Sequence, residues 1–272
     1  MLREWVESWR TLCPVPLRRL GHAYAAAALT ARARRCREAW APHQDRTRDA
    51  IRGAIAQCRN RHTAVILGSG PLLDVPLDDL AARFDRVLLV DAAHPPIARR
   101  AARRFPNVGL ISLDLTGTAE ILADPAASAP PVPGCRAFLD DPTIDLVVSV
   151  NLLSQLPLMP LACAARRWPD MDLAALGRAI VTAHLAHLDI LPGVKLLVTD
   201  LDRTTLGPSG DILAIDDPLF GIRLPPGPEW TWLLAPPGEL SGGRTLRSRV
   251  RAVQLHADSP MAHFSRGDTA PG

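Results

Sequence analysis

TAVILGSGPLLDVPLDDLAARFDRVLLVD, residues 63–91, is the stretch that decides the fold. An apolar run enters the turn Gly68-Ser69-Gly70, a helix-like segment follows, and a second apolar run ends in Asp91. Glycines let the backbone approach a ligand closely, and a helix behind them offers unpaired N–H groups. A carboxylate at the end of the next strand can accept hydrogen bonds from ribose hydroxyls. This order predicts a nucleotide-binding half-site; the alternative is a tight turn without a ligand.

From residue 63 onward, continuous apolar runs alternate with amphipathic segments. The runs predict strands at 64–68, 86–91, 108–113, 144–150 and 194–200. The segments between them predict helices at 72–83, 95–105 and 171–190, with a weaker one near 118–124. The proline-rich stretches 125–143 and 208–228 predict loops. Continuous runs are typical of strands covered on both faces, so the alternation indicates a parallel sheet with right-handed crossovers.

The two ends of the chain differ from this middle. Residues 1–60 predict helices, the second and third beginning at Pro16 and Pro42. The first of them has an apolar side made of Leu2, Trp5, Val6, Trp9 and Leu12. Strand patterns at 229–234 and 245–256, with no helix between them, predict an antiparallel hairpin.

The whole pattern predicts an α/β protein: a Rossmann-like parallel sheet with a C-terminal antiparallel hairpin and an N-terminal helical cap. We expect a helical cap at 1–60, the sheet domain at 61–257 and a disordered tail at 258–272.

Composition narrows the class of protein. The chain has 272 residues, 47% of them apolar, and a formal net charge of +3 with interspersed signs, so we expect no nucleic-acid partner. No uninterrupted apolar run reaches the length of about 18 residues that spans a membrane, and the start, MLREWVESWR, lacks the apolar core of a signal peptide. Five scattered cysteines without CxxC spacing predict reduced thiols, no zinc site and a cytoplasmic location. Composition makes no prediction of oligomeric state.

Five parallel strands closed by a late antiparallel hairpin resemble the class I S-adenosylmethionine-dependent methyltransferase fold over about residues 60–256. The residues that carry the resemblance are Gly68, Gly70, Asp91, Asp114 and the segment 145–157. In that family the acid after the second strand binds the ribose, and the acid after the third often meets the adenine amino group. The residue ending the fourth strand lies beside the reactive methyl. The resemblance thus implies cofactor contacts from Gly68, Ser69, Gly70, Asp74, Asp91, Ala92, Asp114, Leu115, Asn151 and Leu152.

Two departures from the family pattern keep other functions open. Ile66 stands where that family usually has an acid, with Asp74 as a possible replacement, and Leu72 stands where a third glycine is common. A non-catalytic cofactor-binding or scaffold protein of the same fold is therefore an alternative. An NAD(P)-dependent dehydrogenase is a lesser one, because Leu73 interrupts the GxGxxG pattern and no Tyr-xxx-Lys pair exists.

We expect a small-molecule acceptor, because the sequence has no basic stripe with interleaved aromatics of the kind that nucleic-acid binders show. Methyl transfer needs mainly proximity and orientation, sometimes with a base, and we take His43 as the candidate base. The nearby Arg46 and Arg48 could bind an anionic acceptor. The other candidate substrate contacts are Tyr24, Ser154 and Gln155. The alternatives are a solvent-exposed His43 at a helix start, and a capping role for the residues that follow the fourth strand.

Three further sets of residues have two interpretations each. His184 and His187 share a helix face and could bind a metal, but the sequence offers no third ligand apart from Asp189, so we expect a packed pair and no metal site. Asp200 and Asp202 at the end of the fifth strand either contact substrate or form a turn. The tryptophans at 230 and 232 share a strand face and either pack in the core or cover a flat acceptor.

Overall fold

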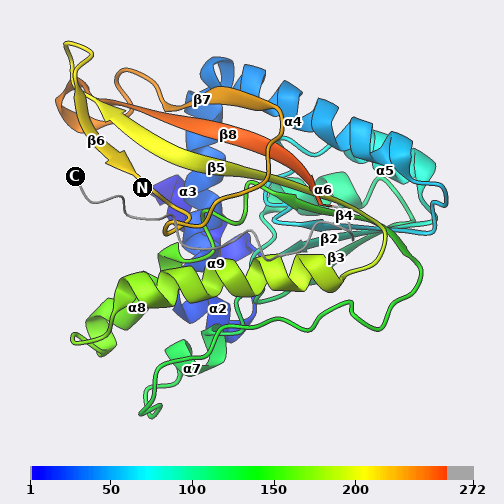
Figure 1. Ribbon diagram of the computed structural model, residues 1–272, viewed down its shortest axis with the longest axis horizontal. Coiled ribbons are helices and arrows are strands. Elements are labelled where there is room, and N and C mark those ends of the chain that lie inside the picture. The colour runs from blue at the N-terminus through cyan, green and yellow to red at the C-terminus, as the bar shows by residue number, and fades with distance from the viewer. Residues whose placement is uncertain (1, 256–272) are drawn as a thin grey trace.

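The computed structural model describes residues 2–255 and shows one mixed eight-stranded sheet with helices on both faces (Figure 1). The tail expected at 258–272 lies outside the described residues. The strands are β1 (Thr63–Leu67), β2 (Arg86–Asp91), β3 (Val108–Ser112), β4 (Ile144–Val150), β5 (Val194–Leu206), β6 (Ile212–Asp216), β7 (Glu229–Ala235) and β8 (Thr245–Leu255). The helices are α1 (Leu2–Arg10), α2 (Val15–Arg19), α3 (His22–Arg35), α4 (Arg37–Gln57), α5 (Leu77–Arg83), α6 (Pro96–Ala102), α7 (Ala119–Ala123), α8 (Leu158–Arg167) and α9 (Leu173–Ile190).

The sheet has the order β3-β2-β1-β4-β5-β8-β7, and β6 pairs with the outer part of β5. Strands β1 to β5 are parallel, whereas β8 runs antiparallel to both β5 and β7. The predicted α/β fold with a terminal antiparallel hairpin is therefore confirmed. Because β2 and β4 flank β1 on opposite sides, the chain leaves β1 and β4 in opposite directions. Ligands of such sheets bind at the crevice that this reversal opens at the carboxyl ends of the strands.

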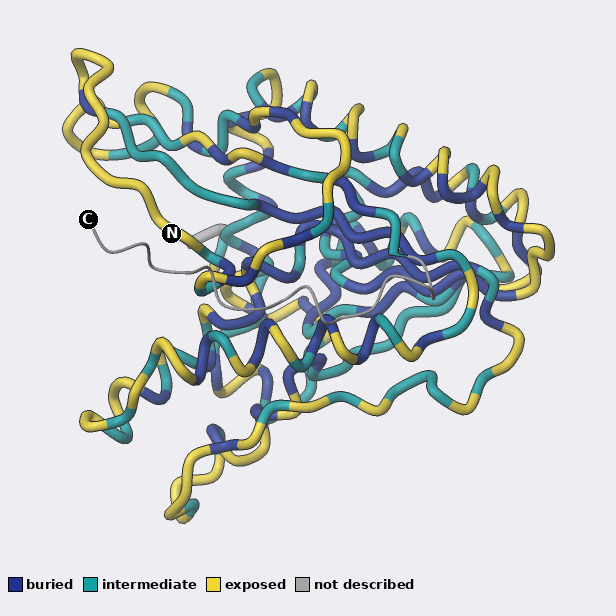
Figure 2. The backbone as a smooth tube through the Cα atoms, viewed as in Figure 1, coloured by how far each residue is buried: buried dark blue, intermediate teal, exposed yellow. Residues whose placement is uncertain are grey.

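Side chains that alternate along the strands build a core on each face of the sheet. On β1, Ala64 and Ile66 pack with α4 and α5, whereas Val65 and Leu67 pack toward the face that carries α8 and α9. Figure 1 shows α4 and α9 on opposite sides of the sheet, and Figure 2 shows the central strands buried between them. Burial on both faces is the reason these strands read as continuous apolar runs.

The N-terminal helices share these cores. Ile51 and Ile55 of α4 are buried against the sheet, and Leu17 of α2 belongs to the opposite core. Helix α4 begins at Arg37, so Pro42 lies inside it and does not start it. The actual break comes at Cys36, which has non-helical backbone angles. Whether residues 1–60 act as a separate cap stays a prediction.

The apolar side of α1 does not pack into a core. Trp5 and Trp9 on that side are exposed, as is Leu12 just after the helix, whereas Thr11 is buried. Arg18 fixes this orientation by donating to the Thr11 carbonyl at 2.6 Å, and the backbones of Leu12 and His94 bond to each other. A helical periodicity identifies an apolar face but not the element that covers it.

Three segments differ from their predicted structure. The helix expected at 72–83 begins only at Leu77, because Leu72 has a left-handed backbone (φ 62°) and Pro76 precedes the helix. Helix α8 was not predicted, and β6 lies within a predicted loop. All five residues of β6 are exposed, so no burial pattern marks this strand in the sequence.

Helix α9 is long and apolar enough to cross a membrane, with a mean hydropathy of 1.2. In this structure it packs on the sheet through buried residues that include Ile180, Leu185 and Leu188. A core helix of this kind passes the same test of length and composition as a membrane span.

Candidate functional site

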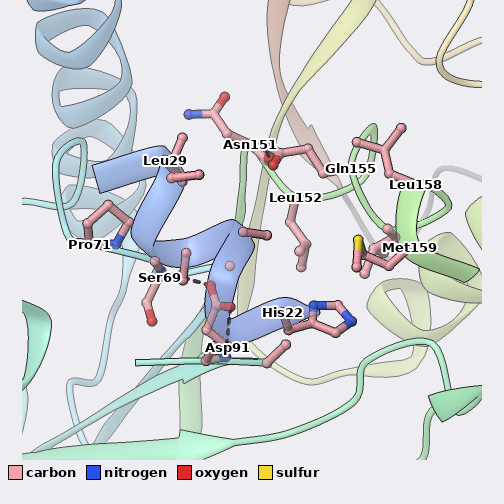
Figure 3. Close-up of a pocket in the computed structure, with 18 of the residues that line it drawn as sticks. His22, Leu29, Ser69, Pro71, Asp91, Asn151, Leu152, Gln155, Leu158 and Met159 are labelled. Carbon is pink, nitrogen blue, oxygen red and sulfur yellow. Dashed lines mark hydrogen bonds between the residues drawn. The ribbon is translucent and has the colours of Figure 1, made fainter. Parts of the chain in front are cut away.

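A cavity of about 600 Å³ opens at the carboxyl ends of β1 and β4, where the strand order reverses. Its floor is formed by the loops that follow β1, β2, β3 and β4, and α3 lies across it with Ala25 and Leu29 in its wall. Figure 3 shows Asp91 and His22 on one side of the space and Asn151, Leu152 and Gln155 on another. This volume is within the range of about 300–1,000 Å³ typical of small-molecule and cofactor sites.

The glycine turn after β1 has a backbone that only glycine fits at its first position. Gly68 has φ +80°, and a Cβ there would lie 2.7 Å from Cβ of Leu152 and 2.8 Å from the Val150 carbonyl oxygen. The turn therefore lies directly against the loop after β4. Ser69 is buried, lines the cavity, and its hydroxyl has no hydrogen-bond partner among the described residues. No helix N-terminus follows this turn directly, so the predicted contribution of a helix dipole is absent at the site.

Asp91 ends β2 at the cavity wall. Its Oδ2 accepts a hydrogen bond from the backbone N–H of Gly70 at 2.8 Å, and its Oδ1 accepts one from Ala93 at 3.3 Å. Each carboxylate oxygen has a further lone pair to offer a ligand. The carboxylate is thus held in one orientation between the first and second loops, and Ala92 beside it lines the same cavity.

Asp114, after β3, also lines the cavity, but its carboxylate accepts hydrogen bonds from its own loop. Its Oδ1 accepts from the N–H of Thr116 at 2.8 Å and from the Thr116 hydroxyl at 2.6 Å, and its Oδ2 accepts from the N–H of Ala119 at 2.6 Å. These bonds fix the loop that carries Leu115, which lies in the cavity wall. Asp114 therefore shapes this end of the cavity as well as facing it.

Asn151 and Asp74 meet at the other end of the cavity. Asn151 follows β4 with a left-handed backbone (φ 49°), and its Nδ2 lies 2.5 Å from Oδ2 of Asp74. Gln155 donates to the Asn151 carbonyl at 2.6 Å and lines the cavity. Burial raises the pKa of the Asp74 carboxyl above its ordinary value, against the opposing effects of Asn151 and of the charge on Arg48.

His43 is part of the cavity wall, but both of its ring nitrogens face side chains of the protein. It is buried, its ring stacks on Trp232 at 3.9 Å between centroids, and its Nδ1 accepts a hydrogen bond from the indole N–H of Trp230 at 3.0 Å. Burial lowers its pKa to about 3. A base needs a free lone pair and a pKa near the working pH, so this geometry argues against His43 as the catalytic base.

The other predicted acceptor contacts divide between the cavity and its surroundings. Tyr24 lines the cavity, so both Tyr24 and His43 share it with Gly68. Arg46 is exposed and is not in the cavity wall. Ser154 is buried, donates to Asp200 at 3.1 Å and is likewise not in the wall.

The remaining candidates serve the fold. Asp200 pairs with Arg203 at 2.6 Å, away from the cavity. The His184 ring bonds the Ser149 hydroxyl at 2.9 Å, and His187 bonds the Ala137 carbonyl at 2.8 Å. Within residues 2–255 no group of three or more His, Cys, Asp or Glu side chains could hold a metal ion. Trp230 and Trp232 are both buried in the core, and Trp232 also reaches the cavity.

Several wall residues were not singled out from the sequence. His22 starts α3 beside Asp91, and burial lowers its pKa while the charges of Asp91 and Asp114 oppose that effect. Arg32 and Arg35 of α3 both pair with Glu239, which lies in the segment between β7 and β8. Neither an apolar run nor a strand end marks these positions, so no signal in the sequence identifies them.

Two comparisons by sequence find no match, whereas a comparison of structures finds similar chains. No family model and no curated protein matches the chain in sequence. Among solved structures, one similar chain is the N-methyltransferase NodS from Bradyrhizobium japonicum WM9 in complex with S-adenosyl-L-homocysteine. The two chains are 12% identical, the match covers 76% of this chain and 85% of NodS, and the TM-score is 0.30.

Proposed function

We propose that this protein is an S-adenosylmethionine-dependent methyltransferase acting on a small-molecule acceptor. The observation that carries the proposal is the position of Asp91. Its carboxylate ends β2 within hydrogen-bonding distance of the Gly70 N–H, at the wall of a cavity that opens where the strand order reverses. A carboxylate in that position suits the two adjacent hydroxyls of a ribose.

The cavity offers different chemistry along its length. Asp91, His22 and the Asp114 loop would hold the adenosine part, with Ala92 and Leu115 as apolar contacts. Ser69, Asp74 and Asn151 would hold the amino-acid part. Bound in this way, S-adenosylmethionine would supply an electrophilic methyl group, and the chain's own residues would position it.

We place the acceptor between α3 and α8. Tyr24, Leu29, Leu158 and Met159 line this part of the cavity, and Trp232 adds an aromatic surface. Such a wall suits a small apolar or flat molecule, and positioning it beside the methyl group supplies most of the catalysis such a reaction needs. We expect a cytoplasmic protein without nucleic-acid or membrane partners.

Two calorimetric titrations test the cofactor assignment. S-adenosylmethionine and S-adenosylhomocysteine should bind with saturable heat and raise the melting temperature, whereas NAD should do neither. Binding of NAD in place of the two adenosyl compounds would favour the dehydrogenase alternative. Binding of the adenosyl compounds without methylated product from any acceptor in a metabolite screen would favour the non-catalytic alternative.

Asp91→Ala tests the position of the ribose. Losing charge-assisted hydrogen bonds of about 1.5–3 kcal/mol should weaken cofactor binding about ten- to a hundredfold. Asp85→Ala is the matched control, because Asp85 is an exposed acid that immediately precedes β2, at the opposite end from Asp91. Equal dissociation constants for the two variants would place the ribose elsewhere.

A further inference from the structure

The hydrogen bonds around His43 are inconsistent with the amide orientation drawn for Asn151. A neutral imidazole has one N–H and one acceptor nitrogen. The indole N–H of Trp230 can only donate, so Nδ1 of His43, at 3.0 Å, must be the acceptor. Nε2 of His43 therefore carries the proton, yet the atom drawn 3.0 Å from it is Nδ2 of Asn151, which is also a donor.

Rotating the Asn151 amide by half a turn removes this conflict. Amide orientation and histidine tautomer are assigned from the hydrogen-bond network, so exchanging Oδ1 and Nδ2 is consistent with the same atomic positions. Oδ1 then accepts from Nε2–H of His43. In the drawn orientation Oδ1 is buried without any donor among the described residues, and the exchange moves Nδ2 to that position.

The exchange also determines the protonation state of Asp74. Asn151 Oδ1 would then lie 2.5 Å from Oδ2 of Asp74. Two oxygens this close need a proton between them, and about 2.5–2.7 Å is the length of a strong O–H···O bond. Asp74 is therefore the donor, in its neutral acid form, and Asn151 Oδ1 accepts from both neighbours.

We propose that Trp230, His43, Asn151 and Asp74 form one ordered hydrogen-bond chain that keeps Asp74 protonated in the ligand-free protein, and that a cationic group bound in the cavity expels this proton. The chain runs from the Trp230 N–H to His43 Nδ1, and from His43 Nε2–H to Asn151 Oδ1, which also accepts the Asp74 proton. The expelled proton goes to solvent, and the Asp74 carboxylate becomes the counter-ion of the ligand.

The surroundings of Asp74 agree with this assignment. Burial raises its pKa. Arg48 on α4 is the cation that opposes this effect, but Arg48 already pairs with Asp45 at 2.6 Å and donates to the Leu73 carbonyl. His43, the other titratable group on α4 that faces the chain, is neutral because burial lowers its pKa to about 3.

The cationic ligand is the part of the inference that rests on the proposed function. S-adenosylmethionine carries a sulfonium and an ammonium group. The acids Asp91 and Asp114 line the same cavity, while Arg32 and Arg35 in its wall are paired with Glu239. A neutral Asp74 therefore avoids adding a further carboxylate charge to a wall that already carries Asp91 and Asp114.

Infrared spectroscopy of the ligand-free protein tests the proton without any ligand. The spectrum of wild type minus Asp74→Asn at pH 7 should contain the carbonyl band of a protonated carboxyl group. Trp230→Phe should abolish that band, because His43 can then carry its proton on Nδ1 and accept from Asn151. Asn151 would in turn donate to an ionised Asp74. Asp78→Asn is the control, since Asp78 is largely exposed. A carboxylate band for Asp74 in wild type, or an unchanged acid band in Trp230→Phe, would overturn the proposal.

Calorimetry in phosphate and Tris buffers tests the expulsion. The different ionisation heats of the two buffers should report about one proton released per S-adenosylmethionine bound. Affinity should rise about tenfold per pH unit while the free acid is protonated. Asp74→Asn should bind more weakly with no proton release, and Asp78→Asn should behave as wild type. Saturable binding by wild type without proton release refutes the expulsion alone. Absence of any binding refutes the proposed cofactor, while the infrared result still decides the chain.

Discussion

Acid should unfold this protein through histidines that are buried in the neutral state. Burial lowers the pKa of His43 and of His184 from 6.5 to about 3. The native state therefore excludes a proton that the unfolded chain binds below pH 6.5. The free energy of unfolding is therefore not reduced by these histidines above pH 6.5, and it decreases as the pH drops from 6.5 toward 3.

The size of the effect follows from the width of that window. Each pKa unit is about 1.4 kcal/mol, so at pH 5 each histidine costs about 2 kcal/mol of unfolding free energy. The two lie in different layers, His43 on α4 and His184 on α9, on opposite faces of the sheet, so their contributions should add.

Urea unfolding at pH 7.5 and pH 5 measures this loss directly. His184→Gln keeps a neutral amide that can bond the Ser149 hydroxyl, so it should reduce the difference between the two pH values by about 2 kcal/mol. For this variant, the unfolding free energy at pH 7.5 is the reference for its value at pH 5. The control is His62→Gln, because His62 is exposed, with 59% of its side chain accessible. If His184→Gln kept the wild-type difference between the two pH values, burial of neutral His184 would not cause the acid sensitivity.

Two further substitutions test the structure around the cavity. Gly68→Ala should lower the unfolding free energy by about 1–3 kcal/mol, since its Cβ would clash in a left-handed backbone, whereas Gly53→Ala, with nothing within 4 Å on a helix, should raise it by about 0.5–1 kcal/mol; equal changes in urea midpoints would contradict this. Glu239→Gln should speed hydrogen exchange in α3 and make it less salt-dependent, because Arg32 and Arg35 lose their shared partner, at a stability cost of no more than about 1 kcal/mol; unchanged exchange would show that apolar contacts alone hold α3.

The sheet was predictable because strands that are buried on both faces form apolar runs, which are visible in the sequence. The predicted strands at 86–91 and 144–150 coincide with β2 and β4, since both faces of their central residues are covered and most residues of each strand are apolar. Strand β6 was missed for the opposite reason, because its residues are exposed and only the backbone of β5 defines it. The delayed start of α5 depends on Leu72, whose left-handed backbone has no signature in a leucine.

The two ends of the cavity were predictable to different degrees. Gly68 and Asp91 stand at strand ends, so the order of elements places them together before any side-chain contact is known. The contact between His43 and Trp230 joins residues 187 positions apart, on a helix and an antiparallel strand, and no local pattern reports it. Arg46 shows the same limit within one helix, because it is a helical neighbour of the buried His43 at i+3 and yet is exposed.

The two ends of the cavity should respond differently to substitution, because backbone groups orient the polar atoms at one end and side chains orient them at the other. At the Asp91 end, backbone N–H groups hold the carboxylate, so changing a neighbouring side chain leaves the carboxylate oxygens in place. At the Asp74 end, each polar atom is oriented by the next side chain in the line from Trp230. A change in the core at Trp230 therefore reaches the cavity through two intervening side chains, without moving the backbone. The arrangement of polar atoms at this end is for that reason sensitive to residues that do not line the cavity.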